Sequence, residues 1–224
     1  MKQTYILHID TSDAVGTVGL SLDGAYVAHE EAVEQRNHAA SIHLMIEKVL
    51  ADAAILPKDL SAVAVCAGPG SYTGLRIGLA TAKGFCYAWD IPLLMDNKLE
   101  LMALQSVDPT LGMEQRYIPI ISAREGEYFM AILDMEGHIL QEPIHKDEAA
   151  LMEILSEYEC KTLLILENDA KCTLESKNID NIIRLARIDL KSWMKHAVKN
   201  YECKKSVNLS TAEPHYLKQV YTHK

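Results

Sequence analysis

The feature that most constrains the fold is a glycine-rich loop that joins an apolar run to a helical pattern. Residues 63–67 are apolar, the loop at 68–74 contains three glycines, and residues 75–84 continue with helical spacing. Gly68 and Gly70 permit positive φ and a close approach of another backbone segment. The pattern predicts a strand, a tight loop and a helix in direct succession, which is typical of α/β folds.

The loop stands at the start of a helix, where unpaired backbone N–H groups can hold an anion. Pro69 stiffens the loop, and Ser71 or Thr73 can cap the helix. It differs from a phosphate-binding P-loop, because no Lys-Ser/Thr pair follows the last glycine. It also differs from the dinucleotide fingerprint, whose glycine spacing is one residue shorter. Two interpretations stay open: an anion site, or a loop that only turns the chain.

The helix after the loop has small residues on one face, because Gly74, Gly78 and Ala82 recur every four positions. A glycine inside a helix costs roughly 1 kcal/mol relative to alanine, so two of them need a reason. Close packing of another helix is such a reason. Leu75 and Leu79 flank the stripe. The spacing does not distinguish an internal neighbour from a partner subunit.

Composition limits the classes of function. The chain has 224 residues, 49% of them hydrophobic, and a formal net charge of −9. We expect such an acidic chain not to hold a nucleic acid backbone alone, because phosphate contacts need Lys and Arg. The five cysteines are odd in number and include no CxxC pair, which argues against a disulfide framework or a zinc site. No basic-then-apolar leader and no apolar run of about 18 residues is apparent, so we expect a cytoplasmic protein without membrane contact.

The order of predicted elements repeats in the two halves of the chain. The first half predicts strands at 5–10, 15–22, 26–33 and 62–67, with helices at 38–51 and after the glycine loop. The second half, after a helix at 97–106, predicts strands at 117–123, 128–134, 138–144 and 162–167, with helices at 147–157, 179–186 and 192–200. We therefore predict an α/β fold of two similar β-β-β-α-β-α lobes. The expected lobes are residues 1–102 and 103–209, with residues 210–224 either packing back on the first lobe or mobile.

A carboxylate at the first hairpin suggests the actin-like (ASKHA) ATPase plan, in which a hairpin from each lobe grips phosphates. Asp10 and Thr11 fit the first hairpin, but the matching position in the second lobe is Ser122. Residues 168–171 also lack the glycines of a second phosphate segment. We therefore interpret Asp10 and Thr11 as a vestigial phosphate hairpin.

The sequence gives little support for a metal site or for a catalytic nucleophile. His38 and His43 are five positions apart, so about 140° separates them on a helix and one ion does not easily reach both. Ser71 lacks the Gly-x-Ser-x-Gly context of a nucleophile elbow, because position 73 is threonine. We expect no metal site and no catalytic residue.

Four segments resemble one family in the right order: residues 9–12, 67–78, 122–128 and 212–217. They are similar to the TsaB (YeaZ) family, a non-catalytic partner in bacterial tRNA threonylcarbamoyladenosine synthesis. The most specific segment is the glycine-loop motif, which comprises Gly68, Pro69, Gly70, Ser71, Tyr72, Thr73 and Arg76. The resemblance implies an actin-like two-lobe fold and pairing through helices of the first lobe.

The resemblance also implies a function. The chain would be a scaffold subunit, without a cofactor, required for threonylcarbamoylation of the adenosine next to the anticodon in tRNAs that read codons beginning with A. Its partners would be a TsaD-type catalytic subunit and a TsaE-type ATPase, with a homodimer when alone and tRNA contact only through the complex. The interface would comprise Gly74, Leu75, Gly78, Leu79 and Ala82, together with Ile42 and Met45 of the preceding helix.

The family's catalytic paralogue carries a His-x-x-x-His metal pair, and the equivalent positions here are Lys98 and Met102. Lysine is charged and methionine is a poor zinc ligand, so this comparison agrees with a non-catalytic role. The alternative is an enzyme of the same superfold, either nucleotide-binding or metallopeptidase-like. A module that binds a nucleotide without hydrolysing it also stays open.

Overall fold

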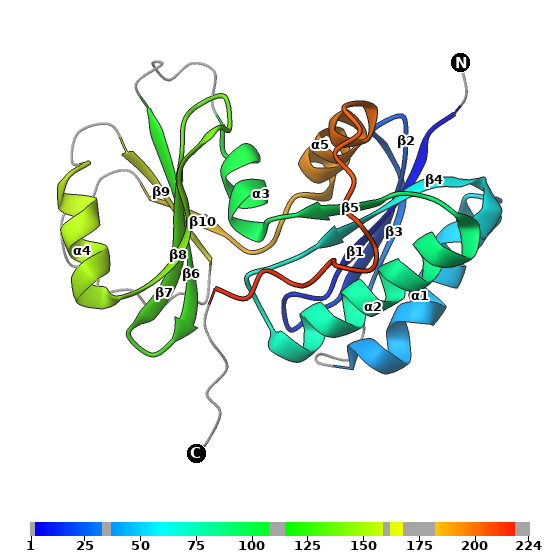
Figure 1. Ribbon diagram of the computed structural model, residues 1–224, viewed down its shortest axis with the longest axis horizontal. Coiled ribbons are helices and arrows are strands. Elements are labelled where there is room, and N and C mark those ends of the chain that lie inside the picture. Colours follow the sequence, from blue (N-terminus) through cyan, green and yellow to red (C-terminus); the bar gives the residue numbers. More distant parts are fainter. Residues whose placement is uncertain (1–2, 33–36, 108–114, 159–161, 168–181, 218–224) are drawn as a thin grey trace. The chain divides into compact units, whose positions relative to one another are not determined.

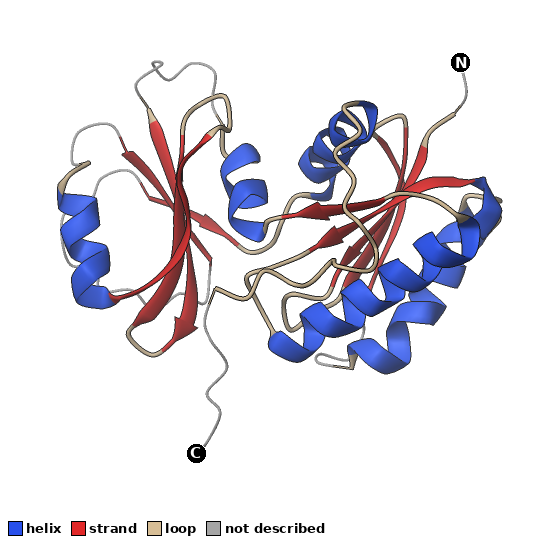
Figure 2. Ribbon diagram, in the orientation of Figure 1, coloured by secondary structure: helices blue, strands red, loops and turns tan. Residues whose placement is uncertain are grey.

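The computed structural model describes residues 3–32, 37–107, 115–158, 162–167 and 182–217. The chain divides into two compact units. The first comprises Met1–Lys98 and Asp189–His215, and the second comprises Leu99–Ile188 and Tyr216–Lys224. Each unit is built on one five-stranded mixed sheet with helices packed on it (Figures 1 and 2).

The first unit has the strand order β3-β2-β1-β4-β5. Strands β1 to β3 pair antiparallel, whereas β1, β4 and β5 run parallel. Its elements are β1 (Tyr5–Asp10), β2 (Thr17–Leu22), β3 (Ala25–Glu31), α1 (His38–Asp52), the 3-10 turn η1 (Pro57–Asp59), β4 (Leu60–Cys66), α2 (Tyr72–Trp89), β5 (Leu93–Asp96) and α5 (Leu190–Glu202).

The second unit repeats this plan, because its strand order β8-β7-β6-β9-β10 matches the first sheet strand for strand. Its elements are α3 (Lys98–Leu104, whose first residue belongs to the first unit), β6 (Arg116–Arg124), β7 (Glu127–Leu133), β8 (Ile139–Asp147), α4 (Glu148–Ser156), β9 (Thr162–Glu167) and β10 (Ile182–Leu185). The predicted α/β architecture with two duplicated lobes is confirmed.

Local sequence signals explain several boundaries. Asp23 and Gly24 both have positive φ, 51° and 77°, as the turn between β2 and β3 requires. Asp147 caps α4 by accepting a hydrogen bond from the backbone N–H of Ala150 at 2.9 Å. Ser71 caps α2 in the same way through the N–H of Gly74. These three signals were readable from sequence because each acts within four residues.

One predicted helix is wrong. Residues 182–185 of the expected 179–186 helix form strand β10, which pairs parallel with β9, and residues 179–181 lie outside the described part of the chain. The segment Ile182-Ile183-Arg184-Leu185 is short and apolar. Periodicity alone does not distinguish such a run from a helix, and pairing with β9 decides its conformation.

The first sheet has helices on both faces. Alternate residues of β1 face opposite sides: Leu7 and Ile9 pack in the cluster that α1 and α2 complete, while His8 contacts the ring of Trp193 in α5, with centroids 5.0 Å apart. Figure 1 shows α1 and α2 lying together on one side of the strands and α5 on the other. The residues of α5 that face the sheet are Trp193, Met194 and Ala197, all buried.

The sequence analysis placed α5 in the second lobe, and the structure corrects this. Buried Asp96, at the end of β5, holds the helix: Trp193 Nε1 donates to Asp96 Oδ2 at 2.7 Å and Asn200 Nδ2 donates to Asp96 Oδ1 at 3.1 Å. Hydrogen bonds to a buried carboxylate are stronger than neutral ones. No local sequence pattern predicts these contacts, because Asp96 is about a hundred positions away from Trp193 and Asn200.

The C-terminal segment continues along the first unit. Val207 donates its backbone N–H to Leu93 at 3.0 Å, and His215 donates to the carbonyl of Ala67 at 2.8 Å. Lys83 Nζ donates to the carbonyl of Ala212 at 3.0 Å. Residues 207–215 thus pack on the first unit, while residues 218–224 lie outside the described residues.

The second unit has a hydrophobic core on each face of its sheet. Leu151 and Leu155 of α4 close one core together with Ile118 and Ile120 of β6. Leu99, Met102 and Ala103 of α3 close the other. In the described part of the chain no helix is both long and apolar enough to cross a membrane.

Buried His8 makes the stability of the first unit sensitive to acid. Burial lowers the pKa of His8 to about 4, although the charge of Asp96 opposes this shift. Between pH 6.5 and 4 the unfolded chain binds a proton here that the folded chain does not. The free energy of unfolding should therefore fall by about 1.4 kcal/mol per pH unit across this window.

Urea titrations at several pH values measure this slope, with His8→Gln as the comparison because it retains a polar group but does not titrate. The variant should lose stability less steeply below pH 6.5. Parallel pH profiles for the two proteins would rule out His8 as the source.

Candidate functional site

The glycine loop packs against the turn that follows β1. Strands β1 and β4 are parallel neighbours, so their carboxyl ends meet at one edge of the sheet. There the N–H of Ser71 donates to the carbonyl of Ser12 at 2.7 Å, and Thr11 Oγ1 donates to the carbonyl of Gly74 at 2.7 Å. The loop and the turn therefore satisfy each other's backbone groups.

The glycines of this segment provide the space for that contact. A Cβ at Gly70 would lie 2.6 Å from the carbonyl oxygen of Ser12, and one at Gly74 would lie 1.9 Å from that of Thr11. A Cβ at Gly78 would lie 2.3 Å from Thr11 Oγ1. Side chains do not fit at such distances. The small residues at 74 and 78 thus serve an internal contact with a hairpin.

This finding corrects the expected partner interface. All seven residues proposed for it, namely Ile42, Met45, Gly74, Leu75, Gly78, Leu79 and Ala82, are buried within the first unit. Ile42, Met45, Leu79 and Ala82 belong to its hydrophobic core. None of the seven presents a surface to another protein in this structure, because the chain's own strands and turn cover them.

The start of α2 is exposed. Gly70, Ser71, Tyr72, Thr73 and Arg76 of the motif face solvent, whereas Gly68 (φ 103°) and Pro69 are buried. The Gly68–Pro69 peptide is cis. The guanidinium of Arg76 lies over the ring of Tyr72, 4.1 Å from its centroid, which makes a cation–π contact.

Three charged groups gather beneath the turn. Lys98 is buried and pairs with Asp13. Burial raises the pKa of Asp10, and the charge of Asp13 raises it further, while Lys98 and the N–H of Ser12, 2.9 Å from Asp10 Oδ1, act in the opposite direction. The lysine offsets part of this negative charge through its ion pair with Asp13, so the three groups form one interacting cluster beneath the turn.

Two further places in the described part of the chain carry side chains of reactive types: Cys66 in the first unit and a polar turn in the second. Burial raises the pKa of the Cys66 thiol well above its usual range, so the thiol stays protonated and unreactive. Among the described residues, Asp134, Glu136 and His138 are the group whose ligand atoms lie within 4.8 Å of one another. Asp134 there accepts hydrogen bonds from the N–H groups of Glu136 and His138, as in an ordinary polar turn.

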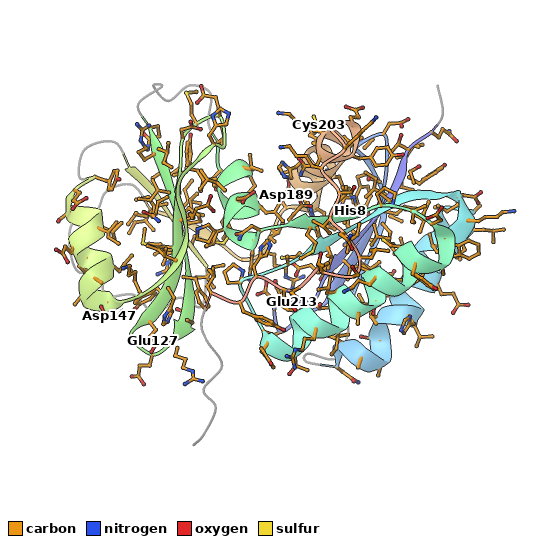
Figure 3. The ribbon with its side chains drawn as sticks, in the orientation of Figure 1. His8, Glu127, Asp147, Asp189, Cys203 and Glu213 are labelled. Carbon is orange, nitrogen blue, oxygen red and sulfur yellow. The ribbon has the colours of Figure 1, made fainter. Side chains whose placement is uncertain are left out.

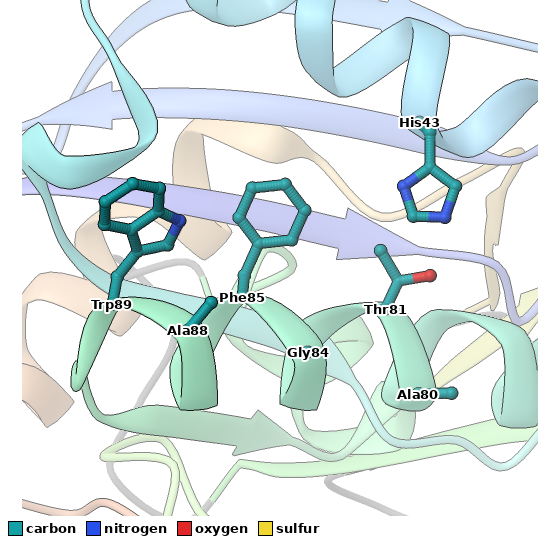
Figure 4. A pocket seen from close by; sticks show the side chains of 7 residues that line it. All are labelled: His43, Ala80, Thr81, Gly84, Phe85, Ala88 and Trp89. Atoms are coloured by element: carbon teal, nitrogen blue, oxygen red, sulfur yellow. The ribbon is translucent and has the colours of Figure 1, made fainter.

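The outer side of α1 and α2 forms a second surface. A hollow of about 410 Å³ lies between the two helices and is lined by His43, Ala80, Thr81, Gly84, Phe85, Ala88 and Trp89. Figure 4 shows His43 of α1 opposite Thr81 of α2, with the Phe85 and Trp89 rings further along α2. Ala80, Gly84 and Ala88 recur every four residues, and a Cβ at Gly84 would meet nothing within 4 Å. Sequence reasoning missed this stripe, although its spacing equals that of the buried one.

A family model described as TsaD, tRNA N6-adenosine threonylcarbamoyltransferase, matches residues 30–159. The tRNA threonylcarbamoyladenosine biosynthesis protein TsaB of Bacillus subtilis (strain 168) is 28% identical over 181 residues, which cover 80% of this chain and 76% of the relative. YeaZ from Pseudomonas aeruginosa superimposes with a TM-score of 0.76 at 19% identity, covering 96% of this chain and 100% of that one.

The chain belongs to the TsaB (YeaZ) family. Its fold also resembles that of an inorganic polyphosphate/ATP-glucomannokinase from Arthrobacter sp., with a TM-score of 0.51 at 12% identity over 88% of this chain and 99% of the kinase. The predicted actin-like fold is confirmed. The glycine motif that carries the likeness to the TsaB family has a packing role in this chain, because it brings the turn after β1 into contact with α2.

The two positions that the resemblance equates with the paralogue's metal-binding histidines, 98 and 102, are lysine and methionine in this chain. Lys98 is 2% exposed and engaged by Asp13. Met102 is also 2% exposed, and it packs in the core of the second unit. Neither side chain is available to hold a zinc ion in this structure. In the second-lobe motif, Tyr128 is buried and Arg124 is exposed.

Two glycines of α2 give opposite predictions for the same substitution. Gly74→Ala should lower the free energy of unfolding by about 2 kcal/mol or more, because the new methyl group collides with the backbone of Thr11. Gly84→Ala should raise it by about 0.5–1 kcal/mol, because alanine favours the helix and open space surrounds the position. Urea unfolding followed by circular dichroism measures both; equal changes would contradict the proposed role of Gly74.

Proposed function

We propose that this chain is a non-catalytic subunit of the machinery that makes threonylcarbamoyladenosine in tRNA. In this proposal it acts in the cytoplasm and holds a TsaD-type catalytic subunit in an active form, with a TsaE-type ATPase joining the pair. Membership of the TsaB family supports the pathway. The observation that carries the scaffold role is the open small-residue face of α2 beside the α1–α2 hollow.

The chemistry of that face suits close pairing with another helix. Ala80, Gly84 and Ala88 leave room for a neighbouring backbone, as small-residue stripes do in helix pairs. Large apolar side chains are exposed on the same two helices: Leu44 is 67% exposed, Tyr87 85% and Trp89 44%. Gathered apolar side chains that a lone protein leaves in water often mark a protein interface.

The interior of the chain supports a role without catalysis. The resemblance implies that Lys98 and Met102 correspond to the metal-binding positions of the catalytic paralogue, and both residues are buried. Asp10 lies beneath the first hairpin, where burial raises its pKa and Lys98 offsets the local charge. In this proposal the catalytic subunit holds the metal ion and the threonylcarbamoyl donor. The TsaB-type chain contributes surface rather than reactive groups.

The same surface would serve a second copy of this chain when the catalytic subunit is absent. Both pairings need the outer face of α1 and α2, so the homodimer and the heterodimer would exclude each other. Sedimentation of the chain with increasing amounts of the TsaD-type subunit should show the homodimer replaced by a heterodimer.

Gly84→Arg tests the interface. Its side chain enters open space, so the variant should fold with unchanged or higher stability. It should lose co-elution with the TsaD-type subunit of the same organism, and tRNA threonylcarbamoylation by the reconstituted set should fall at least about tenfold, the loss expected from about 1.4 kcal/mol of pairing energy. The matched control is Ala149→Arg, at an exposed position of α4, which should keep both properties.

Two outcomes would overturn parts of the proposal. Full modification activity without any TsaB-type chain would remove the scaffold function. Full activity with folded Gly84→Arg would keep the function but place the interface elsewhere on the molecule.

A further inference from the structure

Helix α5 carries a concentration of positive charge that the acidic composition of the chain conceals. The net charge is −9, yet residues 189–205 contain five lysines and only two acidic residues. Lys191, Lys195 and Lys199 are four positions apart, which places them about 6 Å apart along one face of the helix. Lys204 and Lys205 follow the helix, and all five lysines are exposed. We call these five residues the α5 lysine row.

The row faces away from the sheet. The buried side of α5 is Trp193, Met194 and Ala197, which lie well round the helix from the lysines. Figure 3 labels Asp189 and Cys203, the residues that flank α5 at its two ends. The α1–α2 surface lies on the opposite face of the same sheet. Both surfaces are therefore available at the same time.

Folding does not account for this arrangement. Like charges four residues apart on a helix repel each other. Lys191 lies in the first turn, where the helix dipole disfavours a cation, and the dipole favours only lysines in or near the last turn. Within the described residues, Lys195 and Lys199 form no ion pair. The acidic neighbours are Asp189, Glu202 and the Asp23–Gly24 turn, which is beside Lys195.

The end of the helix adds an independent observation. Lys205 N–H donates to the carbonyl of Asn200 at 2.9 Å, and Lys204 N–H donates to that of Tyr201 at 3.0 Å, which is a Schellman cap. Lys204 has φ 56°, the left-handed conformation that glycine adopts with least strain. A lysine at this position carries a backbone cost. The helix dipole favours a positive charge there, but the left-handed backbone conformation does not call for a lysine.

We propose that the α5 lysine row contacts the phosphate backbone of tRNA, so that this subunit supplies part of the binding surface for the substrate. This inference rests on the proposed role in tRNA modification. A row of evenly spaced cations suits a repeating polyanion. A membrane or an acidic protein would favour an apolar anchor among the lysines, and residues 189–205 expose no large hydrophobic side chain. The net charge alone led us to expect tRNA contact only through partners; the local charge distribution changes that expectation.

Salt-dependent tRNA binding tests this proposal. The proteins are the full chain and its complex with the TsaD-type subunit, titrated against an unmodified tRNA transcript by fluorescence anisotropy between roughly 50 and 200 mM salt. Lys195→Ala/Lys199→Ala should weaken binding about tenfold at the upper salt limit. It should also reduce the slope of log K against log salt by about 2, because two phosphate contacts are lost.

The matched control, Lys58→Ala/Lys146→Ala, removes the same charge from elsewhere and should leave Kd and slope near those of the wild type. Lys195→Arg/Lys199→Arg should retain binding. An unchanged Kd and slope in the alanine variant would overturn the proposal, as would an equal loss in the control. Row-dependent binding to phosphatidylserine vesicles without row-dependent tRNA binding would also overturn it, in favour of a membrane surface.

The two proposals can fail separately. The lysine variant should still co-elute with the catalytic subunit, because α5 lies across the sheet from α1 and α2. Gly84→Arg, in contrast, should lose pairing while the isolated chain keeps its row-dependent tRNA contact. The chain could bind tRNA through the α5 lysine row and yet not be needed for tRNA modification. That result would contradict the scaffold role and leave the tRNA contact supported.

Discussion

The close contact between the turn after β1 and helix α2 is the constraint on which the first unit depends. Thr11 and Ser12 lie so near Gly70, Gly74 and Gly78 that a methyl group at any of these glycines would collide with them. Hydrogen bonds from Ser71 to Ser12 and from Thr11 to Gly74 hold the same contact. Packing between the turn and the helix thus explains why residues 70, 74 and 78 are glycines.

This packing also determines which surface of α2 is available for function. One stripe of small residues is used internally by the first hairpin, so the opposite stripe around Gly84 remains exposed. On the other face of the sheet, buried Asp96 holds α5 through Trp193 and Asn200. The first unit consequently carries two helical surfaces of different chemistry, one apolar with small residues and one lined by lysines. Our proposals assign the first to a protein partner and the second to RNA.

Charge has to be judged locally in this protein. Asp10 and Asp13 share one cation, Lys98, beneath the hairpin, so part of their negative charge is offset locally. Within the described residues, the α5 lysine row has few acidic neighbours: Asp189, Glu202 and the Asp23–Gly24 turn. Most of its positive charge is therefore not offset locally. A single net charge of −9 combines these regions and conceals the difference between them.

Sequence by itself determined the elements whose signals are local. The alternating and helical patterns gave the two repeats, and Ser71 and Asp147 marked the helix starts because a cap acts within one turn. The duplicated order of elements then implied the two-lobe fold. A short apolar run such as residues 182–185 was ambiguous, because a strand and a buried helix show the same composition over four residues.

Only the tertiary structure decided which surface faces outward. Gly74 and Gly84 both stand in stripes with a spacing of four, so sequence treats them alike. The first meets the carbonyl of Thr11, more than sixty positions away, and the second meets empty space. The assignment of α5 to the first unit likewise depends on Asp96, about a hundred positions before it. Periodicity along one helix reports the direction of each side chain but not the atoms that it meets, and those atoms come from distant parts of the chain.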